Sequence, residues 1–137
     1  MNILLITGPF NADVSGIPTT KTEAKLGALM WTDRTYRIST INDELVGATF
    51  FKPEHYVDKA TISVTANHNA DVFVAVHEPR DGGLIQGLQT SGWELTNYSI
   101  APRLNKVLKK QISAGSTVLF TSTEDNMTFA ILVKKGS

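Results

Sequence analysis

The sequence contains no cysteine, which excludes disulfide bonds, a thiol nucleophile and thiolate metal ligands. It also lacks a surplus of either charge, because thirteen basic and thirteen acidic residues give a formal net charge of zero. Nucleic acids and anionic membrane surfaces attract proteins with a basic excess. We therefore expect no nucleic-acid partner, and no motif in the sequence points to a cofactor.

Long apolar runs are missing as well. The N-terminal run from Ile3 to Ile6 is far shorter than the roughly twenty residues of a membrane span, so we expect no membrane insertion. No basic segment precedes this run, as one would in a secretory signal peptide, and the compartment is left unassigned. The 137 residues suffice for one domain with a sizeable core.

What the sequence does contain is a succession of short alternating segments, clearest between residues 60 and 78. Ile62, Val64 and Ala66 alternate with polar residues, which is typical of a strand with one buried face. The polar stretch 67–70 favours a tight reversal. Residues 72–76 are all apolar and predict a strand buried on both faces. Together these segments predict a central hairpin.

The same patterns predict further strands on both sides of this hairpin. They cover residues 33–41, 45–51, 93–99, 117–121 and 128–133. Residues 104–112 fit a helical stripe and a strand equally well, residues 84–90 predict one helical turn, and residues 11–22 predict a loop or extended connector.

About seven to nine short strands and no long helix indicate an all-β fold, a single antiparallel β-sandwich or jelly roll with an N-terminal strand or arm. We divide the chain into an arm or edge strand with its connector (residues 1–22) and a sandwich domain (residues 23–137). The expected core consists of apolar residues from the predicted strands: Ile38, Phe50, Ile62, Val64, Val72, Val74, Val118, Phe120, Ile131 and Val133.

Several short motifs in one order resemble a known group of modules. The motifs are Asp33-Arg34-Thr35-Tyr36, Leu45-Val46-Gly47, residues 70–75, Gly92-Trp93, residues 114–118 and residues 127–133. This succession resembles the β-sandwich accessory modules of secreted bacterial polysaccharide lyases and glycoside hydrolases. The resemblance spans about residues 26–134, and it implies a non-catalytic, glycan-directed module without identifying binding residues.

No catalytic constellation stands out. A Gly-x-Ser-x-Gly nucleophile elbow is missing, and the acidic residues near predicted strand ends are of a kind that any sandwich carries. The histidines at 55, 68 and 77 are not spaced as metal ligands, so we expect them to be structural or surface residues and predict no metal site. We therefore expect that the chain is not an enzyme.

Four residues are the candidates for a contact surface: Trp93, Tyr98, Arg80 and Asp81. Trp93 follows a Ser-Gly turn, and its ring could stack on the apolar face of a sugar or could belong to the core. Arg80 and Asp81 lie in a turn and could hydrogen-bond hydroxyl groups. Trp31 and Tyr36 are further aromatic candidates for stacking on a sugar, but they flank a predicted core strand, so we expect them to be buried. Asp33 and Arg34 are adjacent on that strand, so each is expected to find its own partner.

Two functional hypotheses follow. The first is a glycan-binding or adhesion module, weak per site and therefore used in several copies. The second is a structural subunit of a larger assembly, such as a decoration, capsid-associated or fibre protein of a virus particle. The absence of a signal peptide and the apolar segment 3–6, suited to pairing with a neighbour's sheet edge, motivate it. The expected partners are a glycan or neighbouring subunits, most simply copies of this chain, and the setting would be extracellular or on the particle.

Overall fold

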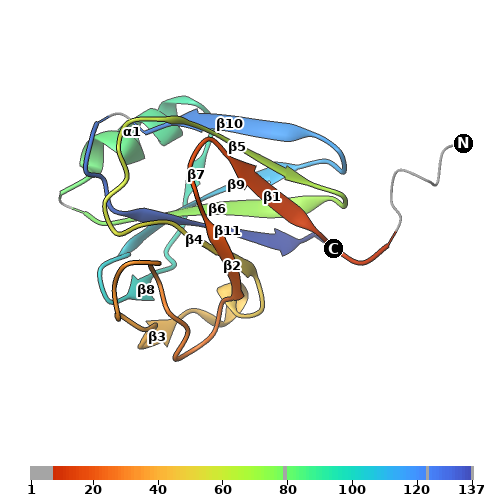
Figure 1. Cartoon of the computed structure of the whole chain (residues 1–137). Coiled ribbons are helices and arrows are strands. Elements are labelled where there is room, and N and C mark those ends of the chain that lie inside the picture. Colours follow the sequence, from red (N-terminus) through yellow and green to blue (C-terminus); the bar gives the residue numbers. More distant parts are fainter. Residues whose placement is uncertain (1–7, 79, 123, 137) are drawn as a thin grey trace, which may run out of the picture.

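The short alternating segments assemble into facing antiparallel sheets in the computed structural model, which describes residues 8–136 apart from 79 and 123 (Figure 1). The smaller sheet has the order β1-β5-β10, with β1 (Ala12–Ser15), β5 (Thr61–Ala66) and β10 (Thr117–Thr121). The larger sheet has the order β2-β4-β11-β6-β9-β7, with β2 (Thr20–Glu23), β4 (Thr49–Lys52), β11 (Phe129–Lys135), β6 (Ala70–Val76), β9 (Lys106–Ile112) and β7 (Glu94–Leu95). The predicted all-β sandwich is confirmed.

The main core lies between the two sheets. Ile62 and Val64 of β5 face this core, while their polar neighbours on the strand are exposed or half-buried, as the alternation predicts. Val72 and Val74 of β6 meet them from the larger sheet. Helix α1 (Gly82–Thr90) closes one end of this core with its three buried apolar side chains.

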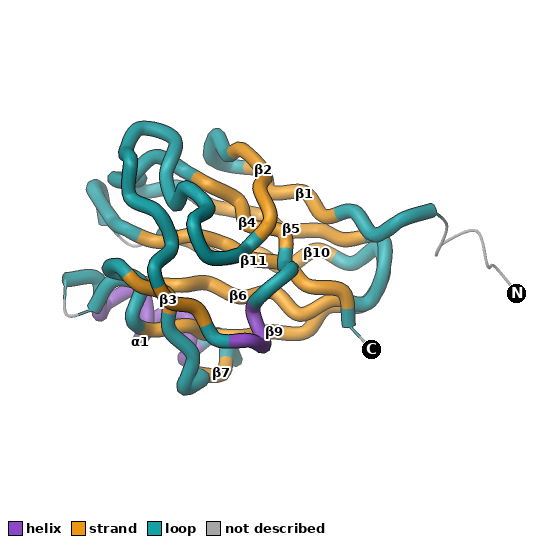
Figure 2. Tube along the Cα trace, turned by 90° about the horizontal axis from the view of Figure 1, so that it is seen from below, coloured by secondary structure: helices purple, strands orange, loops and turns teal. Residues whose placement is uncertain are grey.

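A second core covers the opposite face of the larger sheet. Phe73 and Ala75 of β6 point to this side, where they pack with Trp31, Ile38 and Leu45 from the loops. Those loops include a 3₁₀ turn, η2 (Asp43–Leu45), and a small sheet of β3 (Thr40–Ile41) and β8 (Ile100–Ala101). Seen from below, they lie across the larger sheet (Figure 2). All ten predicted core residues are buried, eight between the sheets and Ile38 and Phe50 in this second core.

The predicted central hairpin is wrong in its pairing. β5 bonds to β1 and β10, whereas β6 bonds to β11 and β9, so the turn at 67–69 crosses from one sheet to the other. Both segments are still strands with an apolar face toward the core. These faces meet across the core, from opposite sheets, instead of lying side by side in one sheet.

Several predicted boundaries also change. Residues 33–39 form turns and a bridge rather than a strand, residues 45–48 contain the end of η2, and residues 93–99 keep only the short strand β7. Residues 84–90 belong to the longer helix α1, and the ambiguous segment 104–112 is a strand from 106 onward. Within the described residues, no helix is both long enough and apolar enough to pass through a membrane.

The prediction of a loop or extended connector at 11–22 is wrong. This segment contains β1 and β2, which pair with β5 and β4 and so belong to the two sandwich sheets. Residues 3–6, proposed as an arm or first strand, lie outside the described residues. Both described ends of the chain meet the turn at 67–69. The N–H of Asn11 donates to Oδ1 of Asn67 over 2.7 Å, and the N–H of Gly136 donates to the carbonyl of Asn69 over 2.7 Å.

Candidate functional site

An aromatic cluster lies at the end of the sandwich opposite those chain ends, beside the bridge between Val57 and Met127 that precedes β11. Trp31 is fully buried at its base, and the ring of His55 stands edge-on to it with 4.6 Å between ring centres. Tyr36 and Tyr56 flank His55 at 6.0 and 4.5 Å and are 38% and 44% exposed. The two tyrosines are therefore partly exposed to solvent and share one buried support.

Arginines from separate parts of the chain surround these tyrosines. The guanidinium carbon of Arg80 lies 4.7 Å from the ring centre of Tyr56, and that of Arg34 lies 5.8 Å from the same centre. Arg103 lies 5.6 Å from the ring centre of Tyr36. We call Tyr36, Tyr56, Arg34, Arg80 and Arg103 the Arg–Tyr surface; each of the five is exposed.

Local bonding fixes the segment that carries Arg34. Nη1 of Arg34 lies 3.0 Å from Oδ2 of Asp33, and Oδ1 of Asp33 accepts the backbone N–H of His55 over 2.9 Å. The sequence prediction of separate partners for Asp33 and Arg34 is therefore wrong. Neighbouring side chains point to opposite faces on a strand, whereas Asp33 ends a turn and Arg34 begins an irregular loop.

The other two arginines are also held in place. Nη1 of Arg80 donates to Oγ1 of Thr128 over 3.0 Å, and Nη2 donates to the carbonyl of Asn126. Arg103 sits at the tip of a turn in which Ile100 and Leu104 exchange backbone hydrogen bonds of 2.7 and 2.9 Å. Its φ of 83° is left-handed, a conformation that favours glycine.

The environment of His55 shows that these charges converge. Burial lowers the pKa of His55 below its ordinary 6.5, the positive charges of Arg34, Arg103 and Arg80 lower it further, and Asp33 opposes them. His55 is 6% exposed, and neither ring nitrogen has a hydrogen-bond partner among the described residues. A buried, unpartnered imidazole is costly, and such groups gather at functional sites.

A groove adjoins this surface. Tyr56 and residues 57–60 line one side of it and residues 16–18 the other, and its volume is about 270 Å³. Its walls mix apolar residues such as Ile17 with the charged residues Glu54, Asp58 and Lys59. A ligand on the exposed tyrosines can therefore extend into a hollow that offers both kinds of contact.

The structure places Trp93 in the main core. Its side chain is 3% exposed and meets the edge of Phe120 with 5.8 Å between ring centres. Stacking on a sugar needs an exposed ring face, so that part of the prediction is wrong and the core alternative holds. The Ser-Gly turn before Trp93 is exposed, but the Trp93 side chain packs in the core cluster that also contains apolar residues of α1 and β10.

The other three predicted contact residues do not form one surface with it. Asp81 is 4% exposed, and its Oδ2 accepts the backbone N–H of Thr128 over 2.9 Å, so it is a structural residue. Tyr98 is half-buried against the second core, with its ring centre 6.3 Å from that of Phe73. Arg80 is exposed and belongs to the Arg–Tyr surface.

Sequence reasoning missed Tyr56 and Arg103 and assigned Tyr36 to the core. Trp31, predicted as core, is fully buried, but Tyr36 is exposed because it lies in an irregular loop rather than on a strand. The adjacent aromatic pair of His55 and Tyr56 in a polar loop is a signal that could have drawn attention to this end of the chain. Nothing in the sequence pattern brings Arg103 to it.

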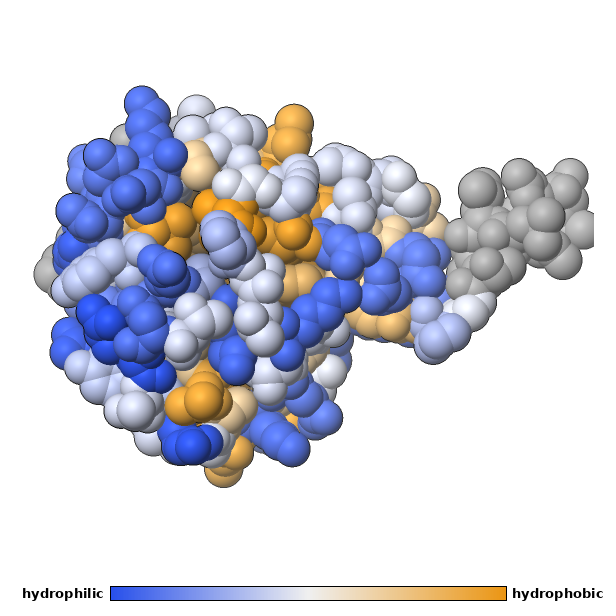
Figure 3. Space-filling model, in the orientation of Figure 1, coloured by the Kyte–Doolittle hydropathy of each residue, from blue (hydrophilic) through white to orange (hydrophobic). Residues whose placement is uncertain are grey.

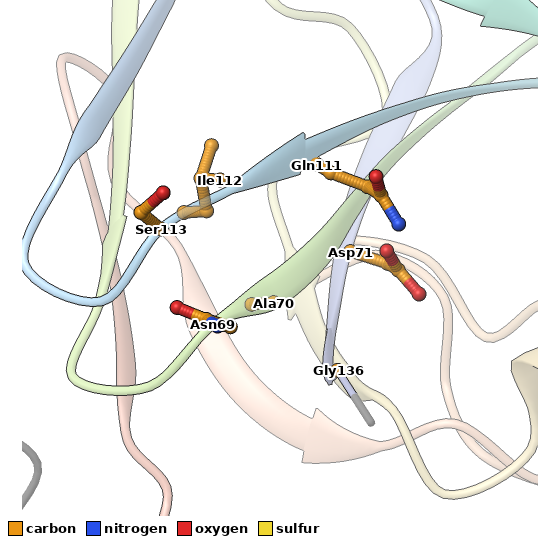
Figure 4. Close-up of a pocket in the computed structure, with 7 residues that line it drawn as sticks. All are labelled: Asn69, Ala70, Asp71, Gln111, Ile112, Ser113 and Gly136. Carbon is orange, nitrogen blue, oxygen red and sulfur yellow. The ribbon is translucent and has the colours of Figure 1, made fainter.

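A second hollow, of about 250 Å³, lies at the strand ends near the described chain ends (Figure 4). Asp71 and Gln111 are opposite each other on β6 and β9 there. Its polar groups are largely occupied, because Asp71 lies 3.9 Å from Lys109 and Oδ1 of Asn69 accepts the N–H of Ala114 over 2.9 Å. No aromatic residue lines it, and it is a weaker candidate for sugar binding.

In the view of Figure 3, apolar residues form separate patches between hydrophilic ones rather than one continuous face. Across residues 8–136, with 79 and 123 left aside, no three histidine, aspartate or glutamate side chains gather in a group that could hold a metal ion.

Comparison with known proteins supports the fold. No protein-family model and no curated protein sequence matches the chain. Among solved structures, it superposes on part of a β-glucuronidase from glycoside hydrolase family 2, with a TM-score of 0.64 and 14% sequence identity. The match covers 96% of this chain and 14% of that one. At this identity the likeness shows the fold, a β-sandwich that recurs as a small part of a much longer chain.

Proposed function

We propose that the chain is a non-catalytic glycan-binding or adhesion module and that the Arg–Tyr surface is its binding site. The observation that carries the proposal is the pair of exposed tyrosines held over Trp31 and His55. Tyrosine rings match the apolar C–H faces of pyranoses, and the surrounding guanidinium groups can donate hydrogen bonds to sugar oxygens. The likeness to part of a β-glucuronidase is in keeping with a carbohydrate-associated setting.

A non-catalytic role fits the chemistry of this surface. Glycoside hydrolysis requires two carboxyl groups that flank the scissile bond. Asp33 lies at the site, but its oxygens are committed to Arg34 and to the N–H of His55. Asp81 is buried against Thr128. Glu54 and Asp58 line the adjoining groove, outside the Arg–Tyr surface itself. On this basis we propose binding without bond cleavage.

Affinity electrophoresis through gels that contain soluble polysaccharides tests this function, because it detects weak binding. We expect at least one polysaccharide to retard the protein, and the Tyr36→Ala and Tyr56→Ala variants to lose about fivefold to tenfold in affinity. Leu95→Ala is the matched control, since Leu95 is 41% exposed on β7, outside the Arg–Tyr surface. Equal losses in the control and in the tyrosine variants would argue against this site.

The outer edge of β10 favours a second function, a structural subunit of a larger assembly. β10 is the last strand of the smaller sheet, and no described strand pairs with its outer edge. Exposed Leu119 of β10 lines a groove of about 400 Å³ with Phe120 and with Leu88 of α1, and this groove also reaches Thr61 of β5. An open edge with an apolar side chain is suited to pairing with another chain.

Analytical ultracentrifugation tests the assembly function. We expect the chain to sediment as an oligomer and Leu119→Lys to dissociate it, because a charge on the edge opposes pairing. Deleting residues 1–10 tests the predicted arm in the same assay. A wild-type chain that stays monomeric at high concentration would contradict this second function.

A further inference from the structure

The charges on the Arg–Tyr surface are unevenly compensated. Arg34 has the Asp33 carboxylate 3.0 Å away, whereas the hydrogen bonds of Arg80 go to the uncharged oxygens of Thr128 and Asn126. Within the described residues, Arg103 forms neither an ion pair nor a hydrogen bond through its side chain. Three arginines thus meet at one end of a chain with zero formal net charge, and among the described residues only Arg34 of the three has a carboxylate partner.

The backbone of Arg103 strengthens this point. Its φ of 83° is strained for any residue with a Cβ, and glycine would relieve the strain. The turn nevertheless carries an arginine, whose guanidinium lies over the ring of Tyr36 and is exposed to solvent. Strained residues with free functional groups are a feature of ligand-binding sites.

We propose that the Arg–Tyr surface binds carbohydrates that carry a carboxylate or sulfate group, and that Arg103 contacts this anion. The inference rests on the proposed glycan-binding function and adds the class of ligand. A guanidinium presents a planar fork of N–H donors that matches carboxylate and sulfate oxygens in pairs. Because Tyr36 and Tyr56 already hold the guanidinium groups, less side-chain freedom is lost when the anion binds.

Matched charged and neutral ligands test the ligand class. The probes are polygalacturonate with its fully methyl-esterified form, and dextran sulfate with dextran, each in affinity gels at low and high salt. We expect the wild type to bind a charged member of at least one pair and to bind its neutral counterpart at least tenfold more weakly. Binding of only one charged polymer would identify the anion as carboxylate or as sulfate.

Variants at Arg103 test its role. Arg103→Gln should weaken binding to the charged polymer about tenfold, through loss of a charge-assisted contact. Arg103→Lys should retain part of the affinity, because it keeps the charge without the fork. Lys135 lies at the end of β11 that points away from the Arg–Tyr surface. Lys135→Gln therefore removes one positive charge far from the site and should leave binding within about twofold. Thermal melts confirm that each variant is folded.

The outcomes separate the two levels of the proposal. Equal binding to charged and neutral polymers would overturn the acidic ligand class and leave the glycan-binding function standing. Equal losses in Arg103→Gln and Lys135→Gln would also overturn the inference, since they indicate nonspecific attraction. No binding to any polymer, charged or neutral, would overturn the glycan-binding function itself.

Discussion

Acid sensitivity of the folded state is the prediction that depends most directly on the geometry around His55. Its imidazole is buried among Trp31, Tyr36 and Tyr56, and it is faced by Arg34, Arg80 and Arg103 with only Asp33 in opposition. Both effects disfavour the imidazolium form, so folding lowers the pKa of His55 below 6.5.

The sign of the effect follows from proton counting. Between the lowered pKa of the folded state and 6.5, the unfolded chain binds more protons at this residue than the folded chain does. The free energy of unfolding therefore falls as the pH decreases through this window and is constant, as far as His55 is concerned, above it. One proton limits the slope to about 1.4 kcal/mol per pH unit.

Urea denaturation between pH 5.5 and 8, above the range where most carboxylates titrate, measures this slope. His55→Phe should flatten it, because phenylalanine fills a similar space without a titrating group. At pH 7.5 the variant should be as stable as the wild type or up to about 1–2 kcal/mol more stable, since two unpartnered buried nitrogens are removed. His68→Gln is the control. An unchanged slope in His55→Phe would refute the reasoning.

Three further predictions concern packing, backbone strain and glycan binding. Phe50→Ala, at a fully buried site in the second core, should lower the free energy of unfolding by about 3–5 kcal/mol, against less than about 0.5 kcal/mol for the exposed Leu119→Ala, both measured by urea denaturation. Arg103→Gly should be about 1 kcal/mol more stable than Arg103→Ala in the same assay, because only glycine relieves a φ of 83°. Trp93→Phe should leave glycan affinity in gels unchanged, since that ring is buried, and a tenfold loss would restore Trp93 as a contact residue.

The strands that sequence reasoning located correctly are those whose pattern reflects burial on one or two faces. Residues 61–66 alternate because one side of β5 meets the core, and residues 72–76 are continuously apolar because β6 is covered on both sides. Pairing could not be predicted from these patterns. Apolar faces that meet across two sheets and faces that lie side by side in one sheet give the same alternation.

The candidate site was largely beyond prediction because loops build it. Tyr36 is exposed because residues 34–36 form an irregular loop where a strand was expected, and Arg103 reaches it from a turn far along the chain. Trp93 was expected at the surface and is buried. An exposed Ser-Gly turn does not determine where the side chain after it points. Local periodicity reports which face of a strand is buried, and it carries no information on which loops meet at one end of a sandwich.

Both described ends of the chain bond to the turn at 67–69, whereas Arg80 follows the far end of β6. β6 has seven residues, so about 23 Å of strand separates that turn from the Arg–Tyr surface. A tether joined to either end would therefore emerge away from the surface and leave it facing outward. Because the described C-terminal end and the Arg–Tyr surface lie at opposite ends of β6, attachment to a sensor chip or bead through the C-terminus would present the tyrosines and arginines to solution.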